Sequence, residues 1–208
     1  LAIARKKTSQ NCAVMIAKGN IDGIQITAGA INFDFIGGSI GAAEGEAIIY
    51  GVQHAIDNNT PYVFFPCGGG QRMFESPIAL ANMTRTTLAI NELKKNNLPY
   101  INIYTNKCYG GISASFAGVS DIAFAEKSSM IGFAGQHIVR NQTREDLPTN
   151  FQSSSELIRT GFCDGEFHRK EINDKIMTVL KILLKKNSAI SAEENEITKD
   201  SQSLSKTA

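Results

Sequence analysis

Hydrophobic and polar residues alternate with two different periods along the first half of the chain. Residues 13–16 and 23–28 carry short apolar runs on either side of a Gly-Asn turn, which predicts a pair of strands. Residues 39–57 and 77–95 instead carry apolar side chains at every third or fourth position, as amphipathic helices do. The pattern therefore predicts an α/β fold.

The sequence also indicates where further elements begin. Ser39 is a candidate N-cap for the first helix, and Ser76 followed by Pro77 predicts the start of the second. A third helix is expected to begin at Gly111 and to run through small residues to Ala117. The remaining expected elements are strands over 121–125 and 130–133, helices over 155–160 and 170–186, and a short helix or an arm over 1–11.

An internal repeat organises the middle of the chain. Residues 58–65 (NNTPYVFF) recur as residues 96–103 (NNLPYINI), an offset of 38 residues. Each copy follows a helix, continues as a buried strand and ends in a glycine cluster, at 68–70 in the first copy and at 110–111 in the second. A repeat of this length indicates stacked supersecondary units.

The composition narrows the class of protein. Hydrophobic residues make up 42% and charged residues 20%, as in ordinary globular domains, and the net charge of +1 gives no general reason to expect nucleic acid as a partner. The four cysteines form no CxxC pair, so neither a zinc site nor a disulfide framework is expected, and free thiols fit a reducing, cytoplasmic compartment. No apolar run reaches the roughly 18 residues that a membrane span needs.

The two glycine clusters are the main candidates for chemistry. A glycine pair after a strand lets the backbone turn sharply and brings its N–H groups close to a ligand. At a helix N-terminus such groups are unpaired and partly positive, which suits a phosphate or a developing oxyanion. A tight turn explains a single glycine pair equally well, but two equivalent junctions favour a ligand. Neither a P-loop nor a dinucleotide-binding glycine motif is present, which argues against an ATPase or a dehydrogenase.

Side-chain catalysts have less support from the sequence. No G-x-S-x-G elbow surrounds Ser113 or Ser115, which we interpret as small packing residues. His137 follows a glycine-containing turn and could reach a pocket. Arg72 follows the first glycine cluster and could pair either with a phosphate or carboxylate of a ligand or with Glu75 in a structural salt bridge. Oxyanion donors without a triad or a metal point to thioester enolate chemistry.

Cys67 and Cys108 each stand just before a glycine cluster. No base lies near them in the sequence, so we interpret both as small, buried thiols.

Several segments resemble the carboxyltransferase β subunit of bacterial and plastid acetyl-CoA carboxylase and occur in the same order as in that family. The resemblance extends from the N-terminus to about residue 180. These segments are FIGGSIG at 35–41, GGQRM at 69–73 with Glu75, LPYI at 98–101, YGGISASFA at 109–117, IGFAG at 131–135, QTREDLP at 142–148 and GFCD at 161–164. The resemblance implies a crotonase-like (ClpP/crotonase) α/β fold, a superhelix of stacked ββα units.

The resemblance also implies an activity. The family transfers the carboxyl group from carboxybiotin on the biotin carboxyl carrier protein to acetyl-CoA, giving malonyl-CoA for fatty acid biosynthesis. The backbone N–H groups of Gly110 and Gly111 would form the catalytic oxyanion hole, with no side chain as general base. The residues expected to bind substrate are Gly69, Gly70, Arg72, Phe133, Ala134 and Gly135.

The implied partners are the carboxyltransferase α subunit, in an α2β2 assembly with a shared active site, together with the carrier protein and biotin carboxylase. No covalently bound cofactor and no metal site are expected in this sequence. Zinc is expected only if the family's four-cysteine ribbon, absent here, precedes these residues. The expected location is the cytoplasm, or a plastid-type organelle in a eukaryote, with neither membrane nor nucleic acid as a partner.

Two departures from the family pattern bear on activity. Gln71 stands where the family usually has alanine, so it adds bulk that could crowd the CoA. Gln136 and His137 stand where the family has Pro-Arg or Arg-Arg, which could weaken phosphate contacts.

Two alternatives stay open: another crotonase-like acyl-CoA enzyme, such as a decarboxylase or hydratase, and a non-catalytic scaffold paralogue. A hydratase would need a pair of carboxylates aimed at the substrate, and the glycine loops contain no such pair. We expect one domain over 1–186, followed by a disordered polar tail over 187–208.

Overall fold

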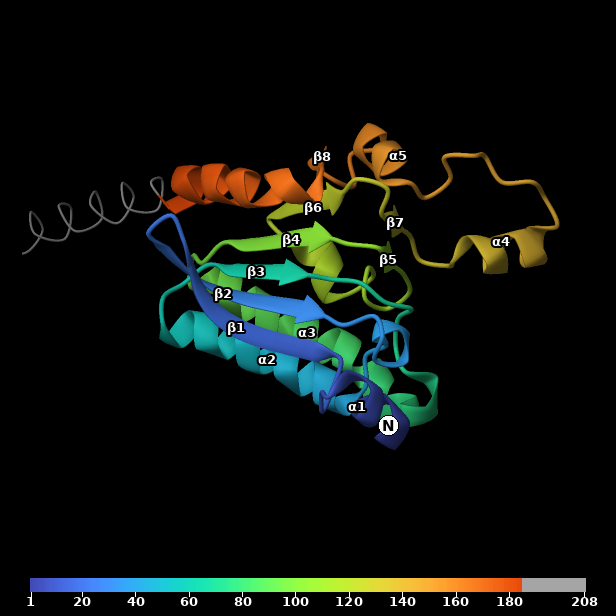
Figure 1. Cartoon of the computed structure of the whole chain (residues 1–208), viewed down its shortest axis with the longest axis horizontal. Helices are drawn as coiled ribbons and strands as arrows, with labels where there is room; N and C mark the ends of the chain where they lie inside the picture. Colours follow the sequence, from blue (N-terminus) through green and yellow to red (C-terminus); the bar gives the residue numbers. More distant parts are fainter. Residues whose placement is uncertain (185–208) are drawn as a thin grey trace, which may run out of the picture.

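A computed structural model of the chain describes residues 1–184, so the expected polar tail lies outside the described residues. A six-stranded sheet runs through the centre in the order β1-β2-β3-β4-β6-β8, and β5 pairs with β7 in a second, small sheet (Figure 1). β1 and β2 are antiparallel, and the other neighbours in the large sheet are parallel. The strands are β1 (Val14–Ile21), β2 (Ile24–Ile31), β3 (Tyr62–Phe65), β4 (Tyr100–Tyr104), β5 (Lys107–Cys108), β6 (Ile122–Glu126), β7 (Met130–Ile131) and β8 (Gly165–Phe167).

Helices cover both faces of the large sheet. α2 and α3 lie against one face, and the helical residues 172–184 lie along the other (Figure 1). The α-helices are α1 (Ala2–Thr8), α2 (Ala42–Asp57), α3 (Ser76–Lys95), α4 (Gln136–Thr143) and α5 (Ser154–Arg159), and the 3₁₀ turns are η1 (Ile36–Gly38), η2 (Met73–Glu75), η3 (Phe116–Val119) and η4 (Arg169–Glu171). None of the helices within residues 1–184 is long and apolar enough to cross a membrane.

The internal repeat sets the register between the two central strands. Tyr62 lies opposite Tyr100 and Val63 opposite Ile101, so β3 and β4 pair with the same 38-residue offset that the sequence shows (62 to 100). The rings of Tyr62 and Tyr100 stack with their centroids 5.6 Å apart. Each copy is therefore one helix–strand unit laid beside the other, as the repeat predicted.

Two apolar clusters hold the layers together. On the side of α2 and α3, the buried cluster includes Ile48, Ile90 and Leu93. On the opposite side, Ile101 and Ile176 belong to a second cluster that joins the sheet to the last described helix. A parallel sheet buried on both faces needs nearly continuous apolar strands, which explains the runs in β3 and β4.

Three expected helix starts differ from the structure. α2 begins at Ala42 with Gly41 as its N-cap, rather than at Ser39, and α3 already includes Ser76. The helix expected from Gly111 to Ala117 is wrong, because that segment forms turns followed by η3. The hydroxyl groups of its serines bond to backbone carbonyls of the same segment, and such bonds compete with regular helix.

The close packing of β2 against β3 predicts a strong effect at Gly29. A Cβ atom added there would lie 2.4 Å from the buried Phe64 ring, whereas one added at Gly19 in β1 would meet nothing within 4 Å. We expect Gly29→Ala to lower the free energy of unfolding by about 1–3 kcal/mol, because overpacking forces neighbours to shift. Urea denaturation followed by circular dichroism measures this, with Gly19→Ala as the matched control. Equal midpoints for the two variants would contradict the packing.

Candidate active site

The two glycine clusters meet where β3 and β5 end. Gly68 forms a parallel bridge with Cys108, in which Gly68 N donates to Lys107 O at 2.6 Å and Tyr109 N donates to Gly68 O at 2.8 Å. A Cβ atom on Gly70, whose φ is +111°, would lie 3.2 Å from Gly111 N. Only glycine suits this backbone angle and this close approach. The structure therefore brings together the two glycine clusters, at 68–70 and 110–111, that follow the two copies of the repeat.

Two of the backbone N–H groups at this junction are unpaired. Gly69 N donates to Gly37 O at 3.0 Å and Gly110 N donates to Phe133 O at 2.8 Å. Within residues 1–184, the N–H groups of Gly70 and Gly111 have no protein acceptor. Two such donors on neighbouring glycines suit an oxygen atom that gains negative charge during a reaction.

The oxyanion role expected for Gly110 does not fit this geometry, because its N–H is already bound to the Phe133 carbonyl. Gly70, expected among the substrate-binding residues, supplies the second free donor instead. The sequence pattern identified the glycine clusters but not which peptide groups stay free, since that depends on a contact with the distant loop at Phe133.

The loop at 133–135 borders the glycines and an apolar hollow. Gln152 Nε2 donates to Ala134 O at 2.6 Å, and a Cβ atom on Gly135 would lie 3.9 Å from the Tyr109 ring. The Phe133 side chain is 70% exposed. It borders a hollow of about 300 Å³ lined by Ser113, Ala114, Ile131, Gly132, Phe133, Leu157 and Phe162. The three residues of this loop thus lie close to the glycine junction, although sequence reasoning did not identify Gln152, which holds the loop in place.

Arg72 is buried and committed to protein partners. Its side chain is 2% exposed, and its guanidinium donates to Glu44 at 2.6 Å and to Glu75 at 2.7 Å. It also donates to Ser39 O at 2.7 Å and to Ser39 Oγ at 3.2 Å, so all three guanidinium nitrogens are engaged. The substrate-binding role expected for Arg72 does not fit this burial, whereas its alternative, a salt bridge with Glu75, is present.

Glu44 was not singled out from the sequence, although a signal for it exists. It stands three residues after Gly41, where a glutamate bonds back to the N-cap of a helix, and its Oε2 accepts from Gly41 N at 2.9 Å. Glu75 accepts from Ala42 N at 2.7 Å. Burial alone would raise the pKa of Glu75, but this hydrogen bond and the Arg72 charge outweigh it and hold the pKa below its usual range.

Gln71 lies against Gly111. A Cβ atom on Gly111 would be 2.7 Å from Gln71 Cγ. With the amide nitrogen facing α3, Gln71 donates to Ala79 O at 2.6 Å and to Ile40 O at 3.2 Å. The extra bulk relative to the family's alanine is therefore anchored to the protein backbone.

The remaining side-chain candidates do not form a catalytic group. Ser113 Oγ donates to Gly110 O at 3.0 Å and to Gly132 O at 2.7 Å, and Ser115 Oγ donates to Gly111 O, which confirms the packing interpretation. His137 is exposed on α4, 3.2 Å from Asn141 Nδ2. Among the described residues, no group of three or more His, Cys, Asp and Glu side chains could hold a metal ion.

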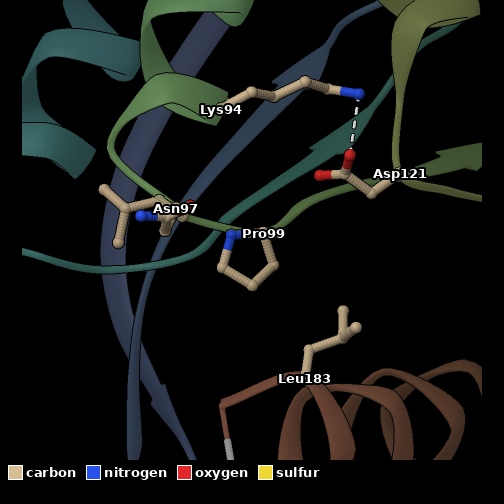
Figure 2. A pocket seen from close by; sticks show the side chains of 6 residues that line it. Lys94, Asn97, Pro99, Asp121 and Leu183 are labelled. Carbon is tan, nitrogen blue, oxygen red and sulfur yellow. Dashed lines mark ion pairs between the residues drawn. The ribbon is translucent and has the colours of Figure 1, made fainter. Parts of the chain in front are cut away.

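A second hollow, of about 190 Å³, lies at the opposite ends of the strands (Figure 2). Lys94 and Asp121 point toward each other there, with Nζ 2.7 Å from Oδ1. Asp121 Oδ2 also accepts from Tyr100 N at 2.8 Å. These charged groups pair with each other and with the start of β4, which is a structural role.

The chain matches the family model of the carboxyl transferase domain over residues 2–206. It is 54% identical over 208 residues, its whole length, to the acetyl-coenzyme A carboxylase carboxyl transferase subunit beta of Pelagibacter ubique (strain HTCC1062). The chain belongs to the acetyl-coenzyme A carboxylase carboxyl transferase subunit beta family. The Rhizobium meliloti (strain 1021) member is 42% identical over 88% of this chain. The chain spans 67% of the length of the Pelagibacter relative and 60% of the Rhizobium one.

Solved structures agree on the fold. The chain is similar to a Pseudomonas malonate decarboxylase hetero-dimer, with a TM-score of 0.71 and 22% identity over 84% of this chain and 78% of that one. It is also similar to transcarboxylase 12S, with a TM-score of 0.72 and 24% identity over 81% of this chain and 33% of that one. These likenesses confirm the crotonase-like α/β fold expected for this carboxyl transferase family.

The free N–H group of Gly111 leads to a prediction. The Cβ atom of a valine at this position would meet Gln71 Cγ at 2.7 Å and Met83 Sδ at 3.0 Å, so the surroundings of this donor must shift. For Gly111→Val we expect the rate of carboxyl transfer per folded protein to fall by about 100-fold or more, as for loss of an oxyanion donor. Gly19→Val is the control. A wild-type rate in Gly111→Val would show that the oxyanion assignment is wrong.

The cysteines near the glycines predict a pattern of thiol reactivity. Burial raises the pKa of Cys67 to about 11 and of Cys163 to about 12, and raises the pKa of Cys108 well above its usual value, whereas Cys12 is only half-buried. We expect a disulfide reagent at pH 8 to label Cys12 in the native protein and all four thiols in urea. Rapid native labelling in a Cys12→Ser variant would contradict this.

The same thiols predict how stability depends on pH. Their folded-state pKa values lie above the unfolded value of about 8.5, so unfolding releases protons at high pH. Their contribution to stability is thus complete below about pH 8.5 and declines as the pH rises toward 11.

Proposed function

We propose that this chain acts as the β subunit of the carboxyltransferase component of acetyl-CoA carboxylase, forming malonyl-CoA from acetyl-CoA. The observation that carries the proposal is the pair of unpaired N–H groups on Gly70 and Gly111, close to an apolar hollow, in a member of this family. Such a pair stabilises the oxygen of a thioester enolate.

In this proposal the chain binds the acyl-CoA and stabilises charge. The thioester oxygen lies within reach of Gly70 N and Gly111 N, and the charge that develops on it is met by donors already held in place, which lowers the barrier. The apolar lining near Phe133 keeps water from the enolate. Carboxybiotin, delivered by the carrier protein, supplies the carboxyl group.

The charged groups beside the glycine loop favour carboxyl transfer over hydration. A hydratase needs carboxylates free to exchange protons with the substrate and water. Glu44 and Glu75, the two carboxylates held by Arg72 at this loop, are engaged by its guanidinium and by backbone N–H groups. Neither is free to act as a base.

An exposed apolar surface next to the site supports the proposal that a partner subunit binds there. Four side chains of η2 and the start of α3 are exposed by between 62% and 91%: Met73, Phe74, Ile78 and Leu80. Exposed apolar patches of this kind mark interaction sites. We propose that the carboxyltransferase α subunit covers them and completes the site in an α2β2 assembly, which works with the carrier protein and biotin carboxylase in the cytoplasm. Zinc would enter only through a ribbon outside this sequence.

Carboxyl transfer from malonyl-CoA to biocytin tests the proposal. The rate is measured for this chain alone, for the α subunit alone, and for the two together after their complex has been confirmed by size-exclusion chromatography. We expect transfer only in the mixture. A stable complex that binds CoA but transfers no carboxyl group would contradict the catalytic proposal and favour a scaffold.

A further inference from the structure

A buried charge cluster lies directly behind the glycine loop and has no substrate role in the reaction proposed above. The Arg72 and Glu44 side chains are 2% and 0% exposed, and Glu75 is 19% exposed. The Arg72 guanidinium also lies over two aromatic rings, 5.7 Å from the centre of Phe35 and 5.8 Å from that of Phe74. A buried charge with this many partners has one well-defined position, because leaving it unpaired is costly.

The cluster holds the segment at 37–41 in place. Arg72 donates to Ser39 O at 2.7 Å, and Glu44 accepts from Gly41 N at 2.9 Å. Glu44 also accepts from Ala13 N at 2.9 Å, which ties this segment to the start of β1. Charge-assisted hydrogen bonds therefore fix the residues of this segment that follow η1.

The same segment also bonds to the backbone on either side of the Gly70 N–H, which is one of the two free donors. Gly69 N donates to Gly37 O at 3.0 Å, and Ile40 N donates to Gly70 O at 2.9 Å. The peptide between Gly69 and Gly70 is thus anchored on both sides to residues 37–41. The backbone of Arg72 bonds to the same segment, because its N–H donates to Ile40 O at 2.8 Å.

We propose that Arg72 is a positioning residue that sets the orientation of the Gly70 N–H through the segment at 37–41. The proposal rests on the proposed carboxyltransferase function and adds a role for the charge cluster within it. An oxyanion donor acts only when it is aimed where the charge develops, so a small rotation of this peptide lowers the rate of the chemical step more than substrate binding.

Arg72→Lys tests the role, because lysine keeps the charge but cannot reproduce the planar fork or its stacking on aromatic rings. In the complex with the α subunit, we expect kcat to fall by about 10-fold to 100-fold, while KM for the acyl-CoA stays within about twofold, because misplacing a catalytic group by about 1 Å costs this much. A purely structural role would reduce the yield of folded complex and leave kcat per folded complex unchanged.

Arg169→Lys is the matched control. Arg169 also pairs with a glutamate, Glu126, at 2.6 Å, but its side chain is 75% exposed and bonds to no residue of the 37–41 segment. We expect wild-type kcat and KM from this variant, because a pair with an exposed arginine contributes little and does not touch the glycine loop.

Glu75→Gln provides a second, milder variant in case Arg72→Lys does not fold. Its amide oxygen can still accept one of the bonds from Arg72 N–H or Ala42 N–H, but without the charge, so we expect a smaller fall in kcat, about threefold to tenfold, again without a change in KM.

The outcomes separate the two proposals. If the wild-type complex transfers no carboxyl group, the proposed function fails. If the wild-type complex is active and the folded Arg72→Lys and Glu75→Gln complexes keep the wild-type kcat, or if KM rises in place of a fall in kcat, the positioning role is overturned. A fall in kcat alone, absent in Arg169→Lys, supports it.

Discussion

The parallel pairing of β3 with β4 is the constraint on which the rest of the structure depends. Its register, Tyr62 against Tyr100, brings two similar helix–strand units side by side, so both strands end at the same edge of the sheet. Because each strand leads into a glycine cluster, the pairing also brings the clusters together. A shift of the register would separate them and remove the two-donor site.

The glycine junction combines tight packing with two unpaired donors. Gly70 has a positive φ and lies within contact distance of Gly111, which leaves no room for a side chain between the chains. The neighbouring N–H groups, on Gly69 and Gly110, bind carbonyls of other loops. The donors of Gly70 and Gly111 are left free by this arrangement, as a site for a developing oxyanion requires.

The charged side chains beside the glycine loop bond to one another and to the backbone, so they are not available to a ligand. Arg72, Glu44 and Glu75 bond to one another and to main-chain groups of residues 13, 39, 41 and 42. The conformation of the glycine loop therefore depends on a buried ion cluster, and the apolar surface of Met73 and Phe74 just outside it remains available to a partner.

The sequence by itself determined the α/β class, the helix–strand repeat, the glycine clusters and the family, because these depend on local periodicity and on ordered segments. Only the tertiary structure decided that the N–H of Gly70 rather than that of Gly110 stays free, that Arg72 faces inward, and that the segment after Gly111 is not a regular helix. The first two depend on a partner distant in the sequence: Phe133 for Gly110, and Glu44 for Arg72. Long-range hydrogen bonds of this kind leave no periodic trace in the sequence, so they become visible only when the elements are packed together.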